Sequence, residues 1–219
     1  MNVLLARCGS LAISLLLLAA LLLAFASPGN TRAAATRAPA TGLWWNPAES
    51  GWGMSLTEQG NVTFVAWYTY DSDGSPMWLV MSACAATERG CSGDLLKVTG
   101  GTPLGVTWSA AQLVTTKVGT GSFDFSDDAN GRFDFTLNGV SGSKSITRLA
   151  VSASGAAPTI DTTGVWWNAQ QSGWGVTLTQ QFSTVFAVIY TYDTRGRPVW
   201  YFASNCAVAG AGCTGDLFQ

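Results

Sequence analysis

The chain has 219 residues, of which 47% are hydrophobic and only 11% are charged, and its formal net charge is −2. This composition excludes a disordered chain, which combines low hydrophobicity with high charge, and it lacks the basic footprint of a nucleic-acid-binding protein. The sequence contains no histidine, so the Ser-His and Cys-His arrangements of nucleophilic enzymes are absent. We therefore expect a folded, non-enzymatic protein with no nucleic-acid partner.

Residues 1–26 are typical of a signal peptide for export. Arg7 supplies a positive charge before the apolar run Leu11–Phe25, and Ala24-Phe25-Ala26 offers a cleavage site. Cleavage after Ala35 is the alternative. The apolar run is shorter than the roughly 20 residues that a membrane-spanning helix needs, so we expect no stable span after cleavage. The expected location is periplasmic or extracellular.

The rest of the chain contains one module twice. Residues 42–97 align with residues 164–219 without a gap at a constant offset of 122, and 27 of the 56 pairs are identical. Repetition at a fixed offset indicates that each copy is one structural unit. The predicted organisation is a signal peptide (1–26), a flexible tether (27–41), a first β module (42–151), a linker (152–163) and a second, incomplete β module (164–219).

The second copy stops where the first has about half its length still to run. We expect either that the sequence is a fragment of a longer protein, or that the half-module is completed by another chain or by packing on the first module. Its remaining strands would have open edges. We expect Phe186, Tyr190, Trp200 and Phe202 to be poorly covered there.

Within the module, apolar residues recur with a period of two, which predicts β-strands. In the segment 64–70, Phe64, Tyr68 and Tyr70 share one face, and the same residue types recur at 186, 190 and 192. A turn at 71–76 follows. We count about eight short strands in about 110 residues, together with a single helical turn expected at 107–113. The predicted fold class is all-β, with tandem small antiparallel barrels or sandwiches of about eight strands, the second one truncated.

Some of these strands are apolar on both faces. Trp67 and Trp78 oppose Tyr68 and Leu79, whereas a sheet with one solvated face alternates apolar and polar residues. The outer face is therefore expected either to be covered by another module or to carry an aromatic binding patch.

Four cysteines follow the signal peptide, in two pairs with the same spacing. Cys84 and Cys91 in the first copy correspond to Cys206 and Cys213 in the second. In an oxidising compartment this pattern predicts one disulfide per module, which stabilises by roughly 2–3 kcal/mol. Two thiols without histidine do not make a four-ligand zinc site, and we expect no metal or other cofactor.

Tryptophan supplies the candidate ligand-binding residues, because the blocks Trp44-Trp45-Asn46 and Ser50-Gly51-Trp52-Gly53 recur almost unchanged in the second copy. Neighbouring residues of a strand point to opposite faces, so one tryptophan of each Trp-Trp pair is expected in the core and the other partly exposed. Exposed aromatic rings suit sugar rings, apolar molecules and protein partners. The candidates are Trp44, Trp45, Trp52, Trp166, Trp167 and Trp174.

Only two acidic residues of the first copy recur in the second. They are Asp71, with Asp193, and Asp94, with Asp216. A carboxylate pair would serve a hydrolase, but a structural role in turns suffices for both, so no catalytic residues are predicted.

The blocks GLWWNPAESGWG, FVAWYTYDSDGSPMW and NGVSGSKSITRL resemble a family of exported bacterial β-rich repeat domains. The resemblance covers the first module and the present half of the second, and it implies no activity or cofactor. More loosely, Gly42-Leu43-Trp44 is similar to the G-x-W that opens lipocalin and avidin barrels, which favours a barrel.

Three functions remain open. The first is an exported, non-catalytic binding or envelope-surface module whose aromatic residues hold a glycan, an apolar small molecule or a protein. The second is a lipocalin-like carrier with an apolar cavity inside each barrel. The third is a carboxylate-dependent hydrolase.

Overall fold

The structure is a computed structural model in which residues 40–210 and 212–219 are described. The predicted signal peptide, its two candidate cleavage sites and the tether up to residue 39 lie outside the described residues. Both parts of the fold, an eight-stranded barrel and a five-stranded sheet, belong to one compact unit.

The described residues form only β-strands, turns and irregular connections, which confirms the all-β prediction. The strands are β1 (Gly42–Trp45), β2 (Gly53–Gln59), β3 (Val62–Tyr70), β4 (Pro76–Ala86), β5 (Gly90–Thr99), β6 (Val114–Phe125), β7 (Asn130–Leu137), β8 (Val140–Arg148), β9 (Gly164–Asn168), β10 (Gln171–Gln181), β11 (Thr184–Tyr192), β12 (Pro198–Ala209) and β13 (Gly212–Thr214).

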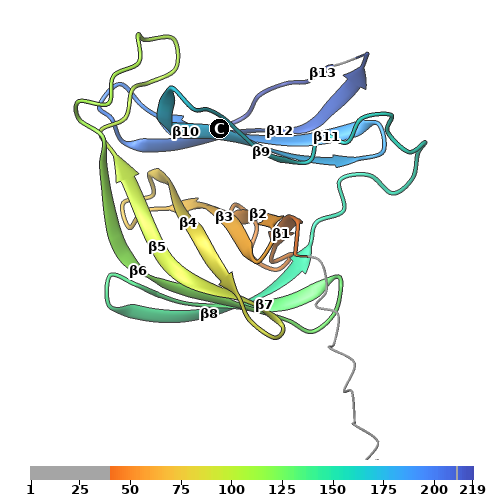
Figure 1. Cartoon of the computed structure of the whole chain (residues 1–219), viewed down its shortest axis with the longest axis horizontal. Helices are drawn as coiled ribbons and strands as arrows, with labels where there is room; N and C mark the ends of the chain where they lie inside the picture. Colours follow the sequence, from red (N-terminus) through yellow and green to blue (C-terminus); the bar gives the residue numbers. More distant parts are fainter. Residues whose placement is uncertain (1–39, 211) are drawn as a thin grey trace, which may run out of the picture. The chain divides into compact units, whose positions relative to one another are not determined.

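Strands β1–β8 form a closed antiparallel barrel, the first of the two predicted architectures (Figure 1). The barrel closes where β1 pairs with β8, with Trp44 opposite Arg148. Its interior is filled with side chains that point inward at every second position of the strands, as the period of two requires. The largest of those that are less than 2% exposed are Trp44, Met54, Leu56, Leu79, Met81, Leu95, Phe133 and Ile146.

Strands β9–β13 repeat the geometry of β1–β5 but do not close. They form an open sheet in the order β13-β12-β11-β10-β9. Local hydrogen bonds recur at equivalent positions: the Trp44 indole donates to the Ala40 carbonyl over 2.8 Å, and the Trp166 indole donates to the Thr162 carbonyl over 2.9 Å. The half-module is therefore folded as the first five strands of a barrel.

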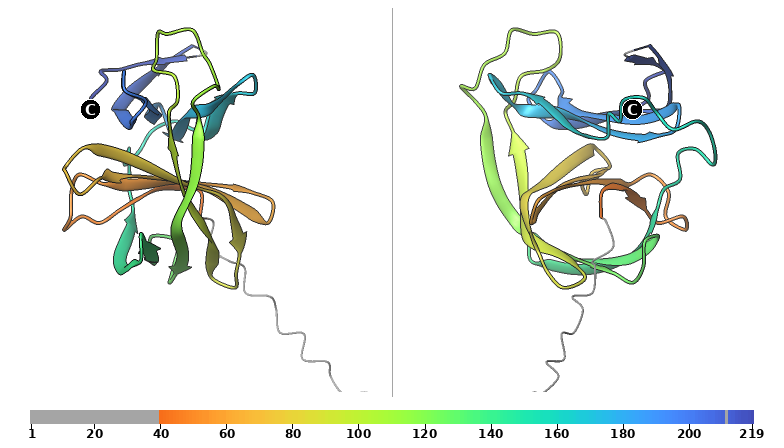
Figure 2. Two further views of the ribbon diagram at one scale, coloured as in Figure 1. Left: turned by 90° about the vertical axis from the view of Figure 1, so that its left-hand side faces the viewer. Right: turned by 45° about the vertical axis from the view of Figure 1, so that its right-hand side comes forward.

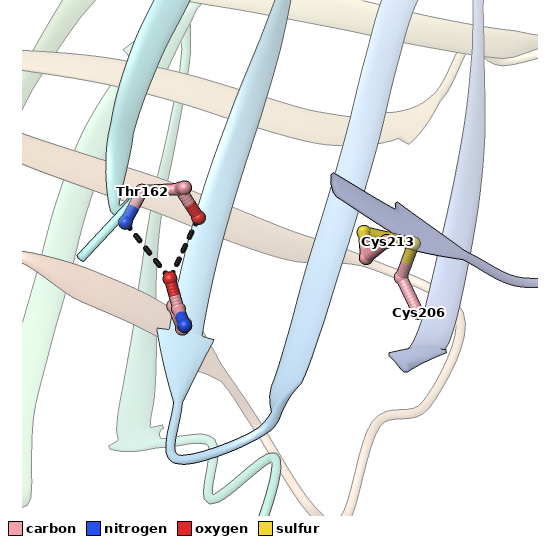
Figure 3. The surroundings of a disulfide bond; sticks show 4 residues. Thr162, Cys206 and Cys213 are labelled. Atoms are coloured by element: carbon pink, nitrogen blue, oxygen red, sulfur yellow. Dashed lines mark hydrogen bonds between the residues drawn. A yellow bond between two sulfur atoms is a disulfide. The ribbon is translucent and has the colours of Figure 1, made fainter. Parts of the chain in front are cut away.

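Both predicted disulfides are present, Cys84–Cys91 and Cys206–Cys213. Figure 3 shows the second one, which links β12 to β13. The first joins β4 to β5, which extend through both cysteines and leave a connection of three residues between the strands. It is a cross-strand link within a hairpin.

The expected helical turn at 107–113 is wrong. This segment is irregular, and it reaches over to the sheet, where Trp108 donates to the Ser172 carbonyl over 3.2 Å. Leu113 packs there against the cluster of aromatic side chains between sheet and barrel. Trp108 and Leu113 are half-buried in these contacts, whereas the other residues of the segment are exposed.

The sheet covers the part of the barrel's outer face that β3, β4 and β5 form. Ala66, Tyr68 and Trp78 of the barrel share one buried cluster with Tyr190 and Trp200 of the sheet, and Figure 2 shows the sheet beside β3 and β4. This packing explains why the strands are apolar on both faces. Of the two explanations offered by the sequence, coverage by the other module is the one observed.

The packing also corrects one expectation. Tyr190 and Trp200 are only 5% and 8% exposed, and Phe186 and Phe202 are partly buried against the same cluster. The poorly covered residues of the half-module lie on its opposite face, which corresponds to the interior of the barrel. The prediction that these four residues are poorly covered was wrong because it did not consider that the barrel packs against their face of the sheet.

Candidate functional site: two aromatic clefts between the repeats

The barrel and the sheet contact each other through equivalent residues. The Trp78 indole donates to the Thr191 carbonyl over 2.9 Å, and its equivalent, Trp200, donates to the Thr69 carbonyl over 3.2 Å. Thr191 is the equivalent of Thr69 at the offset of 122. Such reciprocal contacts define a two-fold-related interface, of the kind that symmetric dimers form between identical subunits.

The same symmetry holds for the rings. The Tyr68 and Tyr190 rings, which are equivalent, lie 6.4 Å apart between centroids. Trp78 lies 5.3 Å from Tyr190, and Trp200 lies 6.0 Å from Tyr68. Burial raises the pKa of both tyrosines well above the ordinary value, so their hydroxyls resist ionisation even at alkaline pH.

Two clefts flank this interface, and the symmetry relates one to the other. The Trp45 cleft has a volume of about 250 Å³ and the Trp167 cleft a volume of about 300 Å³. Each takes one wall from each repeat. The equivalent lining residues are Leu43 and Val165, Trp45 and Trp167, Gly51 and Gly173, Trp52 and Trp174, Tyr68 and Tyr190, Phe186 and Phe64, Trp200 and Trp78, and Phe202 and Val80.

The clefts differ where the second repeat lacks strands. Leu149, which follows β8, lines the Trp45 cleft, and Trp45 itself is half-buried next to Thr147 of β8. Trp167 has no equivalent neighbour in the described sheet and is 60% exposed. The Trp167 cleft contains the polar side chains of Gln59 and Ser82.

The six candidate tryptophans separate into three environments. Trp45 and Trp52 lie together in one cleft, and Trp167 and Trp174 lie together in the other. Trp44, by contrast, is 1% exposed in the barrel core, although part of it borders the Trp45 cleft. Trp166 is the equivalent of Trp44 and is 55% exposed on the open face of the sheet. The side chains of adjacent tryptophans therefore point to opposite faces of the strand, as expected from strand geometry.

A glycine with a positive φ angle precedes Trp52 in one cleft and Trp174 in the other. Gly51 and Gly173 have φ angles of 100° and 99°, a region that residues with a Cβ rarely adopt. Gly173 is also tightly packed, since an added Cβ would lie 2.8 Å from Leu113. In the second copy the ladder between β9 and β10 shifts register between Gln171 and Val176, which is consistent with the bulge that these glycines suggest.

One charged pair lies at the rim of the Trp45 cleft. The Lys144 ammonium sits over the Trp52 ring, 4.7 Å from its centroid, and forms an ion pair with Glu49. The hydrogen bond from Lys144 lowers the pKa of the exposed Glu49 carboxyl. The cation therefore occupies one face of the Trp52 ring, an arrangement that stabilises both the ring and the ammonium group.

The two retained acids have structural partners. Asp71 accepts a hydrogen bond from Lys97 over 2.8 Å, which lowers the pKa of its carboxyl, and it also accepts from the backbone N–H of Ser72 in the turn. Asp94 lies within β5, not in a turn as predicted, and pairs with Lys117 over 2.7 Å. These contacts give both residues a structural role.

Sequence reasoning missed the second wall of each cleft. Tyr68, Phe186 and Trp200 complete the Trp45 cleft, and Phe64, Trp78 and Tyr190 complete the Trp167 cleft. The signal was present, because these aromatic residues recur at the offset of 122 on the outward side of strands whose inward side is also apolar. Only the packing of one repeat on the other reveals that they meet the tryptophan motifs.

No protein-family model, curated protein or solved structure matches this chain. The candidate site is therefore defined by its own geometry and by the internal repeat. No helical segment that could span a membrane occurs in residues 40–210 or 212–219.

Proposed function

We propose that the protein is an exported, non-catalytic binding module that holds a small apolar or aromatic molecule in the two clefts between its repeats. The observation that carries this proposal is the retention of the same cleft twice, with eight pairs of equivalent lining residues. An interface that only packed the two repeats together would need complementary shapes. It would not need a cleft at each of the two equivalent positions. The disulfides are compatible with an oxidising, exported location.

The chemistry of the lining favours an apolar ligand over a sugar. Each cleft is lined mainly by aromatic and aliphatic side chains and by glycine, and a ligand site of this kind relies on a few polar groups for orientation. The hydroxyl of Tyr68, at the Trp45 cleft, already bonds Thr177 over 2.8 Å. A sugar ring would leave several of its hydroxyl groups without partners there, which costs free energy.

The location of the clefts also separates this proposal from a lipocalin-like carrier. The interior of the first barrel is occupied by a buried cluster of aromatic and aliphatic side chains, whereas a carrier of that type needs an internal cavity of about 300 Å³ or more. We therefore assign the ligand to the space between the repeats.

A titration with the neutral fluorophore N-phenyl-1-naphthylamine tests this function. We expect two bound molecules per chain, one lost in Trp45→Ala and the other in Trp167→Ala. Trp166→Ala is the matched control, because its ring lies on the open face, and it should leave both cleft sites intact. Unchanged binding in the Trp45→Ala/Trp167→Ala double variant would overturn the proposal. A lipid and glycan array probed with the full chain then compares the ligand classes directly.

A further inference from the structure

The equivalent tyrosines at the interface between barrel and sheet differ in what their hydroxyl groups contact. The Tyr68 hydroxyl lies 2.8 Å from the Thr177 hydroxyl, which in turn lies 2.9 Å from the hydroxyl of Ser55. These three groups satisfy one another across the interface. The Tyr190 hydroxyl, by contrast, forms no hydrogen bond to any residue that the structure describes.

The direction of the Tyr190 side chain explains this difference. Tyr190 of β11 is paired with Gly175 of β10, and a Cβ added at Gly175 would lie 2.3 Å from the Tyr190 oxygen. The hydroxyl therefore lies over a glycine of its own sheet instead of reaching across the interface. Gly53, the equivalent glycine of the first repeat, has no such contact with Tyr68, because that side chain extends to the other repeat.

The Tyr190 hydroxyl is accessible from the Trp167 cleft. Tyr190 lines that cleft, although only 5% of its surface is exposed. In residues 40–210 and 212–219, the fully buried side-chain atoms without a hydrogen-bond partner belong to Trp52, Thr63, Trp67 and Thr191, so the Tyr190 oxygen is reached from the cleft. A hydroxyl without a partner in an apolar site costs free energy, which an acceptor atom of a ligand recovers.

The chemistry of the cleft restricts the kind of acceptor. Burial raises the pKa of Tyr190, so the hydroxyl keeps its proton and donates it. The residues that line the Trp167 cleft include no charged side chain, so a charged ligand would lose its hydration there without gaining a counter-charge, which is unfavourable. The other polar side chains of the lining, Gln59 and Ser82, are exposed. The ligand that fits has an apolar body and one neutral acceptor oxygen.

We propose that the Trp167 cleft selects neutral, apolar molecules that carry one carbonyl oxygen, and that the Tyr190 hydroxyl donates a hydrogen bond to this oxygen. The inference rests on the proposed function and names the ligand class of one of its two sites. The Trp45 cleft has no equivalent preference, because the Tyr68 hydroxyl is engaged by Thr177. Tyr190 is therefore a specificity-determining residue, and the two clefts differ in the ligands that they hold.

Two fluorophores of nearly equal shape test this selectivity in the full chain. One is prodan, a neutral dimethylaminonaphthalene with a single carbonyl group, and the other is its analogue in which a methylene group replaces the carbonyl group. Titration of Trp45→Ala measures the Trp167 cleft, and titration of Trp167→Ala measures the Trp45 cleft. We expect the ratio of dissociation constants, analogue to ketone, to be about tenfold higher in the Trp167 cleft, because only there does the buried carbonyl find a donor.

A matched pair of variants locates the donor. Tyr190→Phe should be at least as stable as the original protein in urea, since its hydroxyl has no partner in the chain, yet the ratio in the Trp167 cleft should fall about tenfold. Tyr68→Phe should lose stability, because Thr177 loses a partner, without a change of that ratio. Infrared spectroscopy gives a direct readout: the carbonyl stretching frequency of prodan in the Trp167 cleft should rise in Tyr190→Phe as the hydrogen bond is lost.

The outcomes separate this inference from the proposed function. Binding of both fluorophores with one ratio in the two clefts, unchanged in Tyr190→Phe, would overturn the selectivity and leave the proposed function intact. A ratio that falls in Ser82→Ala and not in Tyr190→Phe would also contradict the role of Tyr190. If the full chain bound neither fluorophore nor N-phenyl-1-naphthylamine, the proposed function itself would be wrong, and this inference with it.

Discussion

Ser55 and Thr177 share one hydrogen bond between their side-chain oxygens, 2.9 Å apart, and they occupy the same position in the two repeats. The Tyr68 hydroxyl joins them, 2.8 Å from the Thr177 oxygen. A residue that contacts its own equivalent lies at the axis of a two-fold arrangement. This buried polar contact therefore marks the axis about which the two aromatic clefts are related.

Replacing Thr177 by valine should destabilise the protein by about 1–3 kcal/mol, because two buried hydroxyls lose a partner while the shape is kept. Thr191→Val is the control. The Thr191 hydroxyl oxygen is buried without a hydrogen-bond partner, so its removal should be neutral or stabilising. Urea denaturation of both variants measures the difference, and equal losses would contradict the assigned role of Thr177.

Replacement by alanine should reduce the stability of the protein much more at Trp44 than at its equivalent, Trp166. Trp44→Ala should lower the free energy of unfolding by about 3–5 kcal/mol, since the ring fills the barrel core. Trp166→Ala removes an exposed ring and should cost no more than about 1 kcal/mol. Thermal and urea unfolding give both values, and a large loss in Trp166→Ala would mean that its face is covered.

The sequence predicts most of the fold but only half of each cleft. The period of two, the turns and the paired cysteines indicated short antiparallel strands with one disulfide per repeat, because these are local features of the chain. Trp45 and Trp52 were found because both copies retain them. Tyr68 and Trp200 were not placed beside them, since that contact joins residues from different repeats and depends on which faces pack.

Stability should fall at alkaline pH because of the interface tyrosines. Burial raises the folded-state pKa of Tyr68 and Tyr190, whereas tyrosines of the unfolded chain ionise near pH 10. Above about pH 10 the unfolded state loses protons that the folded state keeps, so the free energy of unfolding decreases as the pH rises. Urea denaturation between about pH 7 and about pH 11.5 measures this slope, which should be shallower in Tyr68→Phe.

The half-module should not fold alone. Residues 164–219 would lose the barrel that covers Tyr190 and Trp200 and would expose apolar side chains on both faces of one sheet. We expect a disordered or aggregating peptide by NMR, whereas residues 40–151 should fold because the barrel is closed around its own core. A dispersed, cooperative spectrum from a monomeric 164–219 peptide would contradict the proposed dependence on the barrel.

The pairing of the repeats through equivalent faces is tested most directly by a Ser55→Cys/Thr177→Cys double variant. The two replaced oxygens are in contact, so the new thiols should form a disulfide within one chain under mild oxidation. Peptide mapping by mass spectrometry of the monomeric, non-reduced protein detects this link. We predict an intramolecular cross-link between positions 55 and 177 in addition to the two native disulfides. Free thiols at both positions, or a cross-link found only between two chains, would contradict the two-fold packing on which the clefts depend.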